Sequence, residues 1–356
     1  MKKKVLIITR LMGQGGTEKI ILQLCRKFHD KFDITVCSGG GVHVDNLEKL
    51  GVKHIKIYDI ETKNIFKILR NFKIISKIIK INDIDIIHTH HRMAAFYAFF
   101  LSSLYKFRFI NTVHNIFFDK KIFTKLILSR AINVAVGKGV ANNLENFFKI
   151  DHQKIHIIYN SVERFKGTQN KLPLIETQRL LNKRIVANFG RLTEQKGFFY
   201  FLEAAKIVKE KNQDVIFLIV GAGELEDQLK DKAKSLNLNE EVYFLGFRND
   251  VQNIMSLIDF TVLSSLWEGF PLTPIESFSV GTPVIATNIE GTNEIVINNF
   301  NGILVEKADS HDLANSILYL LDKEDIFNEL RRNCKETYDN NFSPNIFYKK
   351  YLNLYK

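Results

Sequence analysis

Two glutamates eight residues apart are the residues of this chain best suited to hold a polyhydroxylated, phosphorylated ligand. Glu268 and Glu276 flank a loop whose last residues include Pro274, a residue suited to the first turn of a helix. A carboxylate at such a helix start can accept hydrogen bonds from two vicinal ribose hydroxyls, while the free N–H groups of the loop face a phosphate. Glu276 can equally be a carboxylate that the helix dipole favours at this position.

Two cations precede these glutamates. Arg191 follows a predicted strand directly after Gly190, and Lys196 stands five residues further on, at the entry to a predicted helix. Near the carboxyl end of a parallel strand, Arg191 can act as a forked donor and Lys196 as a point charge for a diphosphate. The alternative is a pair of solvated loop cations.

A glycine-rich turn follows the first predicted strand. Gly15 and Gly16 lie in the segment GQGGTE, and a helical pattern begins at Lys19. Backbone N–H groups and the helix dipole at such a turn favour an anion. The turn is not the dinucleotide fingerprint, because the residue three positions after Gly15 is Glu18 rather than glycine. The glycines can also serve only to close a tight connection.

Histidines gather after another predicted strand. His88, His90 and His91 have a spacing that could suit a metal, but no nearby carboxylate completes a site, so we expect no metal cofactor. His114, a lone histidine after the next strand, has the position of a structural histidine when its sequence is taken by itself.

The elements that must position these residues repeat twice along the chain. Short apolar runs typical of buried parallel strands alternate with helix-length segments, which predicts an α/β fold with doubly wound sheets. A second series of runs begins near residue 184, so we expect two similar domains joined by a linker. The predicted strands are 5–9, 34–37, 84–88, 109–113 and 132–136, followed by 185–188, 215–220, 242–245, 260–263, 283–285 and 302–305.

Charge is distributed unevenly over the 356 residues, whose formal net charge is +11. Residues 1–170 hold 29 lysines and arginines against 13 acidic residues, and the remainder holds 21 against 26. This asymmetry indicates a first half that meets an anionic surface, or else a lysine-rich composition without function. The three cysteines match neither a disulfide framework nor a zinc pattern, which indicates buried thiols in a reducing cytoplasm.

Two segments of the first half are predicted to be basic amphipathic helices. Residues 64–81 interleave apolar residues with lysines and Arg70, and residues 119–130 do the same with three lysines. Packing of the apolar faces on the sheet explains both patterns, and contact with a membrane is the alternative. The apolar run near the N-terminus is too short for a signal peptide or a membrane span.

Nearly the whole chain resembles glycosyltransferase family 4, the retaining glycosyltransferases of GT-B fold also described as group 1. The resemblance implies two Rossmann-like, doubly wound parallel-sheet domains that face a central cleft. The sequence departs from the common pattern of this family at Pro271 and at 277–279, and neither difference removes a charged contact. The motifs that carry it are G-G-x-E at 15–18, G-R-x-x-x-x-K-G at 190–197, V-G-x-G at 220–223, E-x7-E at Glu268 and Glu276, GTPVIAT at 281–287 and GTNE at 291–294.

The resemblance also implies roles for residues. Arg191 and Lys196 should neutralise the donor diphosphate, Glu276 should hold the ribose, and Glu268 should face the transferred sugar. His114 matches the histidine near the anomeric centre, so His114, Glu268, Arg191 and Lys196 are the predicted catalytic residues. The predicted donor-binding residues are Gly15, Gly16, Gly190, Arg191, Lys196, Gly246, Phe247, Glu268, Gly269, Phe270, Leu272, Thr273 and Glu276.

The same resemblance predicts four segments: an acceptor-binding domain at 1–166, a linker at 167–183, a donor-binding domain at 184–340 and a C-terminal helix at 341–356 that packs back on the first domain. The expected partners are a nucleotide-sugar donor, with UDP the commonest nucleotide and GDP or ADP open, and a glycan or lipid-linked acceptor. The predicted setting is bacterial capsule or lipopolysaccharide synthesis in the cytoplasm, with peripheral contact to the anionic inner membrane.

We expect departure of the diphosphate to be driven by positive charge and helix N-termini, without an enzymic nucleophile, and the configuration to be retained. One alternative is a nucleotide-sugar epimerase of the same architecture, which would turn over without an acceptor. Another is a non-catalytic basic module that binds membrane or nucleic acid. The first half has no recognised nucleic-acid motif, so we expect no nucleic-acid partner.

Overall fold

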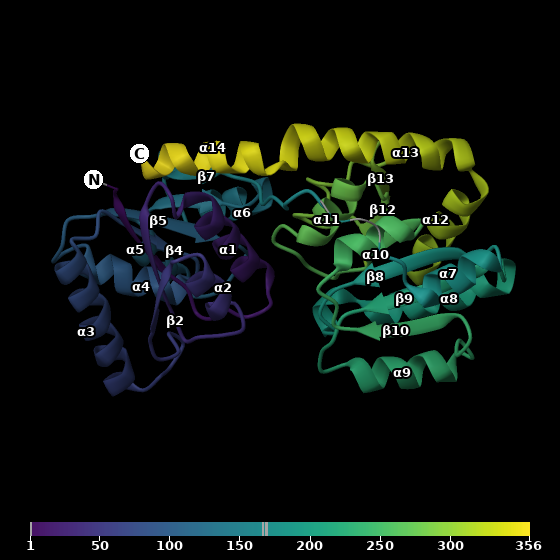
Figure 1. Ribbon diagram of the computed structural model, residues 1–356, viewed down its shortest axis with the longest axis horizontal. Coiled ribbons are helices and arrows are strands. Elements are labelled where there is room, and N and C mark those ends of the chain that lie inside the picture. Colours follow the sequence, from purple (N-terminus) through teal and green to yellow (C-terminus); the bar gives the residue numbers. More distant parts are fainter. Residues whose placement is uncertain (1, 166, 168–169) are drawn as a thin grey trace. The chain divides into compact units, whose positions relative to one another are not determined.

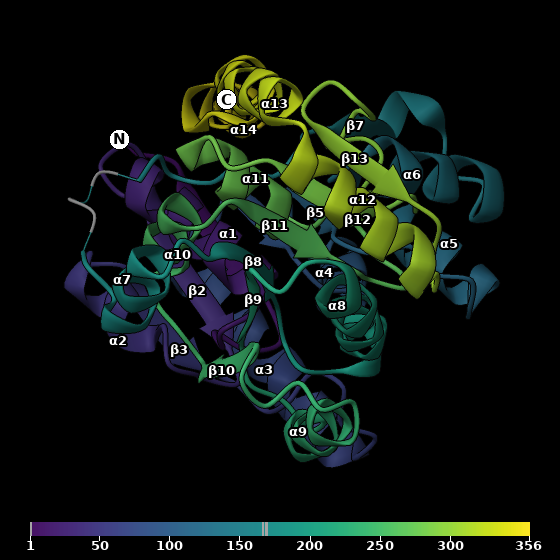
Figure 2. The ribbon, with the colours of Figure 1, turned by 90° about the vertical axis from the view of Figure 1, so that its right-hand side faces the viewer.

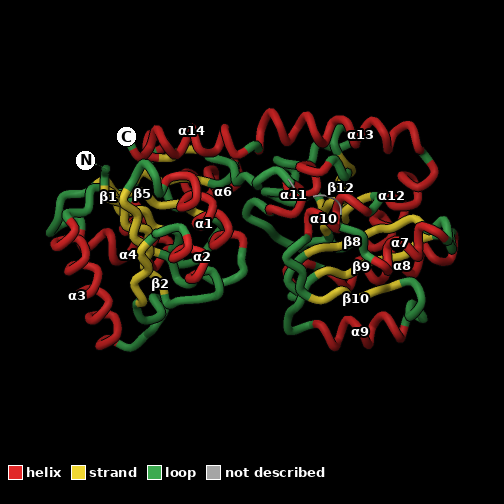
Figure 3. The backbone as a smooth tube through the Cα atoms, viewed as in Figure 1, coloured by secondary structure: helices red, strands yellow, loops and turns green. Residues whose placement is uncertain are grey.

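The chain folds into two compact units, each built on a parallel sheet. The structure, a computed structural model, describes residues 2–165, 167 and 170–356. Unit 1 comprises residues 1–160 and 347–356, and unit 2 comprises residues 161–346. Figure 3 shows the strands of each unit between layers of helices. The two units therefore have the doubly wound architecture predicted from the sequence, and each is described below by itself.

In the described part of unit 1, seven parallel strands have the order β3-β2-β1-β4-β5-β6-β7. Helices α3, α4 and α5 contact one another in series and cover one face of the sheet, while α1 and α14 pack together on the other (Figure 1). The strands are β1 (Lys4–Ile8), β2 (Asp33–Ser38), β3 (Lys53–Lys56), β4 (Ile86–Thr89), β5 (Arg108–Val113), β6 (Ile132–Ala135) and β7 (Ile155–Ile157). The helices are α1 (Gly16–Phe28), α2 (Val44–Lys49), α3 (Ile65–Asn82), α4 (Arg92–Leu101), α5 (Lys121–Leu128) and α6 (Lys138–Asn142), with α14 (Pro344–Tyr355) ending in this unit.

In the described part of unit 2, six parallel strands have the order β10-β9-β8-β11-β12-β13. Helices α8 and α12 lie on one side of this sheet, and α10 and α11 lie on the other (Figure 2). The strands are β8 (Arg184–Phe189), β9 (Val215–Val220), β10 (Val242–Gly246), β11 (Phe260–Leu263), β12 (Val284–Thr287) and β13 (Gly302–Val305). The helices are α7 (Pro173–Leu180), α8 (Phe198–Lys211), α9 (Glu226–Ser235), α10 (Val251–Leu257), α11 (Leu272–Val280), α12 (Ser310–Asp322) and α13 (Glu324–Thr337).

Burial on both faces explains why the strands read as continuous apolar runs. Every residue of β9 is buried, and alternate residues of β8 and β9 point into two separate cores. A strand covered by helices on both faces needs no polar face. The three cysteines are free and buried, as predicted.

Two strands were not predicted, β3 and β7, and both lie at edges of the sheet in unit 1. Neither contains a fully buried residue, so neither carries the apolar run that marked the other strands. Short, polar edge strands are common because they discourage pairing with other chains.

The predicted linker at 167–183 contains a helix that the sequence did not predict. The expected boundary at 166 and residues 168–169 lie outside the described residues, but α7 occupies the second half of the range. Its Ile175 is buried in the same core as β8 and α10, so α7 is part of unit 2. With only one fully buried residue, α7 has no apolar stripe by which a helix could be predicted. The expected C-terminal helix corresponds to α14, whose residues from Phe347 onward belong to unit 1.

Candidate functional site

Most of the predicted site residues follow strands at which the strand order reverses, whereas His114 follows β5 and Gly246 ends the edge strand β10. In unit 2, β8 lies between β9 and β11, and the loops after β8 and β11 lead to helices on opposite faces. In unit 1, β1 lies between β2 and β4 in the same way. Open α/β sheets bind ligands beyond the carboxyl ends of such neighbouring strands. Each described sheet therefore has one position of this kind.

Lys196 and Glu268 are brought together at this position in unit 2. Lys196 Nζ lies 2.5 Å from Glu268 Oε1, and the two side chains are 17% and 7% exposed. Ser265 Oγ donates to the same carboxylate oxygen at 2.8 Å, and Gln195 Nε2 lies 3.5 Å from Oε2. The sequence assigned Lys196 to the diphosphate and Glu268 to the sugar, but the structure joins them in one ion pair. Gln195 and Ser265, which support this pair, were not predicted as site residues.

The loops after β8 and β11 are fastened to each other around this ion pair. Ser264 Oγ donates to the carbonyl of Lys196 at 2.9 Å, and the amide of Leu266 donates to the carbonyl of Gln195 at 2.7 Å. Gly197 has φ +61°, and a β-carbon there would lie 2.1 Å from the Ser264 carbonyl oxygen. A side chain at position 197 would therefore separate the two loops.

The N-terminus of α11 offers two adjacent backbone donors. The first N–H groups of a helix have no acceptor within it, and those of Leu272 and Thr273 occupy the first two helical positions. Pro271 at the N-cap and Pro274 at the third position have no N–H group to add, and no side chain caps this helix. Two amides and the positive end of the dipole thus stand beside the loop of Glu268. Glu276 lies one turn further along α11 and is 8% exposed.

Arg191 and Gly190 stand at the end of β8. Arg191 is exposed, and its guanidinium makes no ion pair within the described part of the chain, so it is free to bind an anion. A β-carbon on Gly190 would lie 3.3 Å from the side chain of Lys196, which shows how closely that lysine passes. Gly221, at φ +154°, approaches even closer, because a β-carbon there would lie 1.8 Å from the Gly190 carbonyl oxygen.

The remaining predicted donor residues of unit 2 differ in exposure. Gly246 ends β10 with φ +64°, and the next side chain, Phe247, is 48% exposed. Gly269 is buried against Gly291, while Phe270 is only 5% exposed. Phe247 is therefore accessible to a ligand, and Phe270 belongs to the core beneath the loop.

In unit 1 the glycine-rich turn begins α1. Gly15 is the N-cap and Gly16 the first helical residue, with no side-chain hydrogen bond to the cap. The Glu18 carboxylate folds back toward the turn, since a β-carbon on Gly15 would lie 2.4 Å from Glu18 Oε2. The Glu18 carboxylate thus supplies the negative charge that the dipole of α1 favours at this helix start.

His114 contacts another histidine. It follows β5 and its Nε2 lies 3.0 Å from Nδ1 of His90, which follows the neighbouring strand β4. Burial, and then the charge of His91, lowers the pKa of His114 to about 4. Burial also places the pKa of His90 well below its usual value. Both rings are therefore neutral near pH 7, and a cavity of about 110 Å³ adjoins them.

The histidine cluster of the sequence separates into different environments. His88 is fully buried, with Nδ1 2.7 Å from the hydroxyl of Tyr355 and Nε2 2.8 Å from that of Thr112. His91 caps α4 by accepting from the amide of Met93. Across residues 2–165, 167 and 170–356, no group of three or more histidines, cysteines or acidic residues has the geometry to hold a metal ion. That no metal takes part in the reaction stays a prediction.

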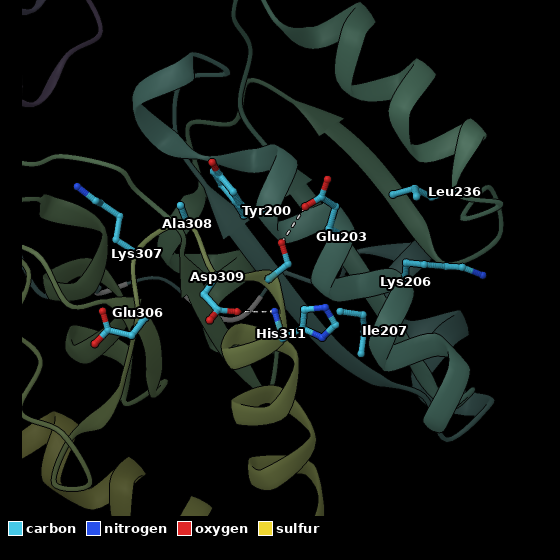
Figure 4. A pocket seen from close by; sticks show the side chains of 11 residues that line it. Tyr200, Glu203, Lys206, Ile207, Leu236, Glu306, Lys307, Ala308, Asp309 and His311 are labelled. Carbon is cyan, nitrogen blue, oxygen red and sulfur yellow. Dashed lines mark hydrogen bonds between the residues drawn. The ribbon is translucent and has the colours of Figure 1, made fainter.

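A larger hollow of about 590 Å³ lies elsewhere in unit 2 (Figure 4). Its polar groups bind one another: Glu203 accepts from Ser310 Oγ at 2.8 Å, and Asp309 caps α12 by accepting from the amide of His311. The hollow contains none of the residues predicted from the sequence. Volume alone therefore does not identify the site.

Comparison with known proteins gives these loops a family. The family described as "Glycosyltransferase Family 4" matches residues 14–164, and "Glycosyl transferases group 1" matches residues 175–340. An Escherichia coli enzyme named UDP-Gal:alpha-D-GlcNAc-diphosphoundecaprenol alpha-1,3-galactosyltransferase is 32% identical over 92% of this chain and 90% of its own. A Campylobacter jejuni enzyme named N,N'-diacetylbacillosaminyl-diphospho-undecaprenol alpha-1,3-N-acetylgalactosaminyltransferase is 25% identical over 88% of each chain.

A solved structure agrees with these relatives. The glycosyltransferase from Rickettsia africae ESF-5 superimposes with a TM-score of 0.88 at 28% identity, covering 100% of this chain and 98% of its own. The two matched domains together span both units, and the E. coli relative is similar along nearly its full length. The chain therefore belongs to glycosyltransferase family 4, the group 1 glycosyltransferases of GT-B fold.

Proposed function

We propose that this glycosyltransferase moves a hexose from a UDP-hexose to the sugar of a lipid-linked diphosphate, with retention of configuration, in the synthesis of a bacterial surface polysaccharide. The observation that carries the proposal is the arrangement beyond β8 and β11. There, Arg191, the Lys196–Glu268 pair and the first two amides of α11 all lie just beyond the ends of two neighbouring strands, and groups of these kinds are suited to bind a diphosphate. The names of the E. coli and C. jejuni relatives support an undecaprenyl-diphosphate-linked acceptor.

The chemistry requires stabilisation of a leaving diphosphate more than a nucleophile. Glu268 shares its carboxylate with Lys196, Ser265 and Gln195, so it is suited to hold the lysine in place. Positive charge on Arg191 and Lys196 would stabilise the developing diphosphate, and the acceptor hydroxyl would lose its proton to a phosphate oxygen. Glu276, one turn further on, would bind the ribose hydroxyls. His114 would act on the transferred sugar in the reacting complex.

Trp267 gives a direct measurement of donor binding. It is the one tryptophan of the chain, is 53% exposed and immediately precedes Glu268. Titration of its fluorescence with UDP, GDP and ADP should show tightest binding for UDP. Lys196→Ala and Glu276→Ala should each lower the affinity for UDP by about tenfold or more, because each removes a charged hydrogen-bonding group. Lys206→Ala and Glu290→Ala, in the same unit, are matched controls that should bind UDP normally.

Transfer itself is tested with UDP-hexoses and a GlcNAc-diphospho-lipid. The expected product carries the hexose with the anomeric configuration of the donor, as read by proton NMR. Release of an altered UDP-sugar without acceptor would instead identify an epimerase. Absence of any nucleotide-sugar binding would contradict the assignment of the site.

We propose in addition that unit 1 touches an anionic membrane through a surface formed by α3, the end of α4, and α5. We name as the α3–α5 surface the exposed apolar residues Ile65, Phe66, Leu69, Phe100, Leu104, Phe118, Ile122 and Leu126. Helix α4 contacts both neighbouring helices, and its Phe96 packs on Phe72 of α3 and on Phe123 of α5. Exposed basic residues on the same helices, among them Lys67, Lys73 and Lys125, would bind anionic headgroups.

Helix α3 supports both interpretations of its basic amphipathic pattern, namely packing on the sheet and contact with a membrane. Ile75, Ile78 and Ile79 are buried against the unit, whereas Ile65 and Phe66 near the start of the helix are 57% and 73% exposed. No helix in the described ranges is both long and apolar enough to cross a bilayer. Within α3, the first turns are therefore the part that would contribute apolar side chains to the α3–α5 surface.

Sedimentation with vesicles tests this contact. The protein should bind vesicles that contain phosphatidylglycerol and release them at 0.5 M salt, at which the Debye length is only about 4 Å. Phe66→Ser combined with Ile122→Ser should reduce binding at low salt, whereas Phe247→Ser, an equally apolar change in unit 2, should not. Equal binding to uncharged vesicles would contradict the proposal.

A further inference from the structure

The contact between His90 and His114 determines which nitrogen of His114 carries a proton. A neutral imidazole has one N–H donor and one bare acceptor nitrogen. Because His90 Nδ1 and His114 Nε2 lie 3.0 Å apart, one of these two nitrogens must donate and the other accept. The pair therefore has two arrangements, which place the proton of His114 on opposite sides of its ring.

The other nitrogen of His90 distinguishes the two arrangements. His90 is 4% exposed, and its Nε2 is buried with no hydrogen-bond partner in the part of the chain that the structure describes. If His114 donated, His90 would carry its proton on Nε2, leaving a buried N–H without an acceptor. Buried N–H groups without a partner are rarer than acceptors without one. His90 therefore donates from Nδ1, and His114 accepts at Nε2.

Neighbouring groups offer His90 no other arrangement. The ring of His88 lies 4.1 Å from that of His90, centroid to centroid, but both of its nitrogens are already bonded to Tyr355 and Thr112. Thr112 Oγ1 is also 3.0 Å from the hydroxyl of Tyr351. Close packing on His88 holds the His90 ring without satisfying its Nε2. Within the described residues, the polar contact of the His90 ring is thus the one to His114.

We propose that His90 is a positioning residue that fixes His114 in the tautomer with its proton on Nδ1, so that His114 meets the sugar as a hydrogen-bond donor and not as a base. That His114 donates a hydrogen bond to the sugar rests on the proposed function, in which His114 acts on the transferred sugar. The assignment of the tautomer does not rest on the proposed function, because it follows from the contacts within unit 1. The hydrogen-bond-donating form of His114 is the useful one beside a sugar whose diphosphate departs as an anion. In this form His114 can bind a hydroxyl oxygen of the sugar without taking a proton from it.

The tautomer can be read without any assay of activity. Long-range proton–nitrogen correlation spectra of protein labelled with 15N-histidine distinguish protonated from bare imidazole nitrogens at pH 7.5. The signals of His114 are identified by their loss in His114→Gln. We expect a proton on Nδ1 and a bare Nε2; a proton on Nε2 of His114 would overturn the proposal. This result stands whether or not a UDP-hexose is the donor.

Two variants of nearly identical shape test the consequence for turnover. In His90→Asn the amide can still donate to His114 Nε2, whereas in His90→Asp the ionised carboxylate can only accept. His90→Asn should keep kcat within about threefold, and His90→Asp should lower it about tenfold or more, with KM nearly unchanged. The spectrum of His90→Asp should show the proton of His114 moved to Nε2.

Equal kcat values in the two variants, with both proteins folded, would overturn the positioning role. Folding of unit 1, which contains position 90, is checked by hydrogen exchange of the β4 and β5 amides, and binding of UDP through Trp267 shows that unit 2 is unaffected. If the unaltered protein transferred no hexose at all, the proposed function would fail, and the spectrum would still decide the tautomer. The two failures are therefore distinguishable.

Discussion

At the scale of single residues, two glycines of unit 2 make different demands on the chain. Gly221 and Gly246 both have positive φ, but only at Gly221 would a β-carbon strike the backbone, 1.8 Å from the Gly190 carbonyl oxygen. Nothing lies within 4 Å of a β-carbon placed on Gly246. Gly246→Ala therefore tests the energetic cost of a positive φ in a residue with a side chain. Gly221→Ala adds to this cost the clash of the new β-carbon with the Gly190 backbone.

We expect Gly246→Ala to lower the free energy of unfolding of unit 2 by about 1 kcal/mol. Gly221→Ala should lower it by about 3 kcal/mol or more and also displace Arg191, because Gly190 must move. Urea unfolding followed by Trp267 fluorescence measures both changes. Similar losses in the two variants would show that the backbone at Gly190 yields easily.

The buried histidines of unit 1 make its stability depend on pH. An unfolded histidine has a pKa near 6.5, whereas burial lowers the pKa of His88 to about 3 and that of His114 to about 4. Between about pH 6.5 and pH 4 the unfolded chain therefore binds protons that the folded chain does not. Stability from these groups is complete above pH 6.5 and is lost as the pH falls.

As the pH falls below about 6.5, the free energy of unfolding of unit 1 should decrease by about 1.4 kcal/mol per pH unit for each such histidine. Hydrogen exchange of the β4 and β5 amides, corrected for intrinsic rates, measures this dependence at pH 7, 6 and 5. Unit 2 contains only His311, so β8 and β9 are an internal control. A flat profile in β4 would show that the histidines are protonated in the folded state.

At the scale of elements, α14 contributes polar as well as aromatic groups to unit 1. Tyr355 Oη is the partner of His88 Nδ1, while Tyr351 Oη contacts Thr112, which also bonds to His88 Nε2. Rings of the same helix pack on α1, with Tyr355 5.5 Å from Phe28 between centroids. Loss of the two hydroxyls should therefore have unequal effects.

Tyr355→Phe should destabilise unit 1 by about 1–3 kcal/mol, because it leaves a buried nitrogen of His88 without a partner. Tyr351→Phe should cost about 1 kcal/mol or less, since Thr112 keeps its bond to His88. Exchange rates of the β4 amides compare the two. The reverse order would mean that Thr112 depends on Tyr351 more than His88 depends on Tyr355.

At the scale of the whole molecule, unit 1 is built from both ends of the chain and unit 2 from one continuous segment. Lys3 Nζ bonds to the carbonyl of Lys356, so the two ends of the chain meet within unit 1. A cut after residue 160 therefore removes part of the core of unit 1. The same cut leaves unit 2 intact up to residue 346.

A fragment of residues 161–346 should fold and bind UDP with the affinity of the full chain, measured through Trp267. A fragment of residues 2–160 should show poor dispersion in proton NMR, because the rings of Phe28 and Phe32 lose Tyr348 and Tyr355. Joining residues 344–356 to the second fragment through a flexible linker should restore it. A well-folded 2–160 fragment would contradict this dependence.

How much the sequence could predict varies with the kind of feature. Strands such as Val215–Val220 were predicted because burial on both faces writes an unbroken apolar run into the chain. Edge strands β3 and β7 and helix α7 lack such runs, because few of their residues are buried. The loops that hold Arg191, Lys196, Glu268 and Glu276 were predicted from motif spacing and their position after strands. The roles of these residues stay predictions.

The sequence by itself determined the two doubly wound domains, because periodicity is a local property that follows from burial. Tertiary structure alone decided that Lys196 meets Glu268, 72 residues away, and that His90 meets His114. Those contacts depend on strand order, which places β8 beside β11 and β4 beside β5. A pattern along one segment cannot contain this information, because the partner of each residue lies on another segment.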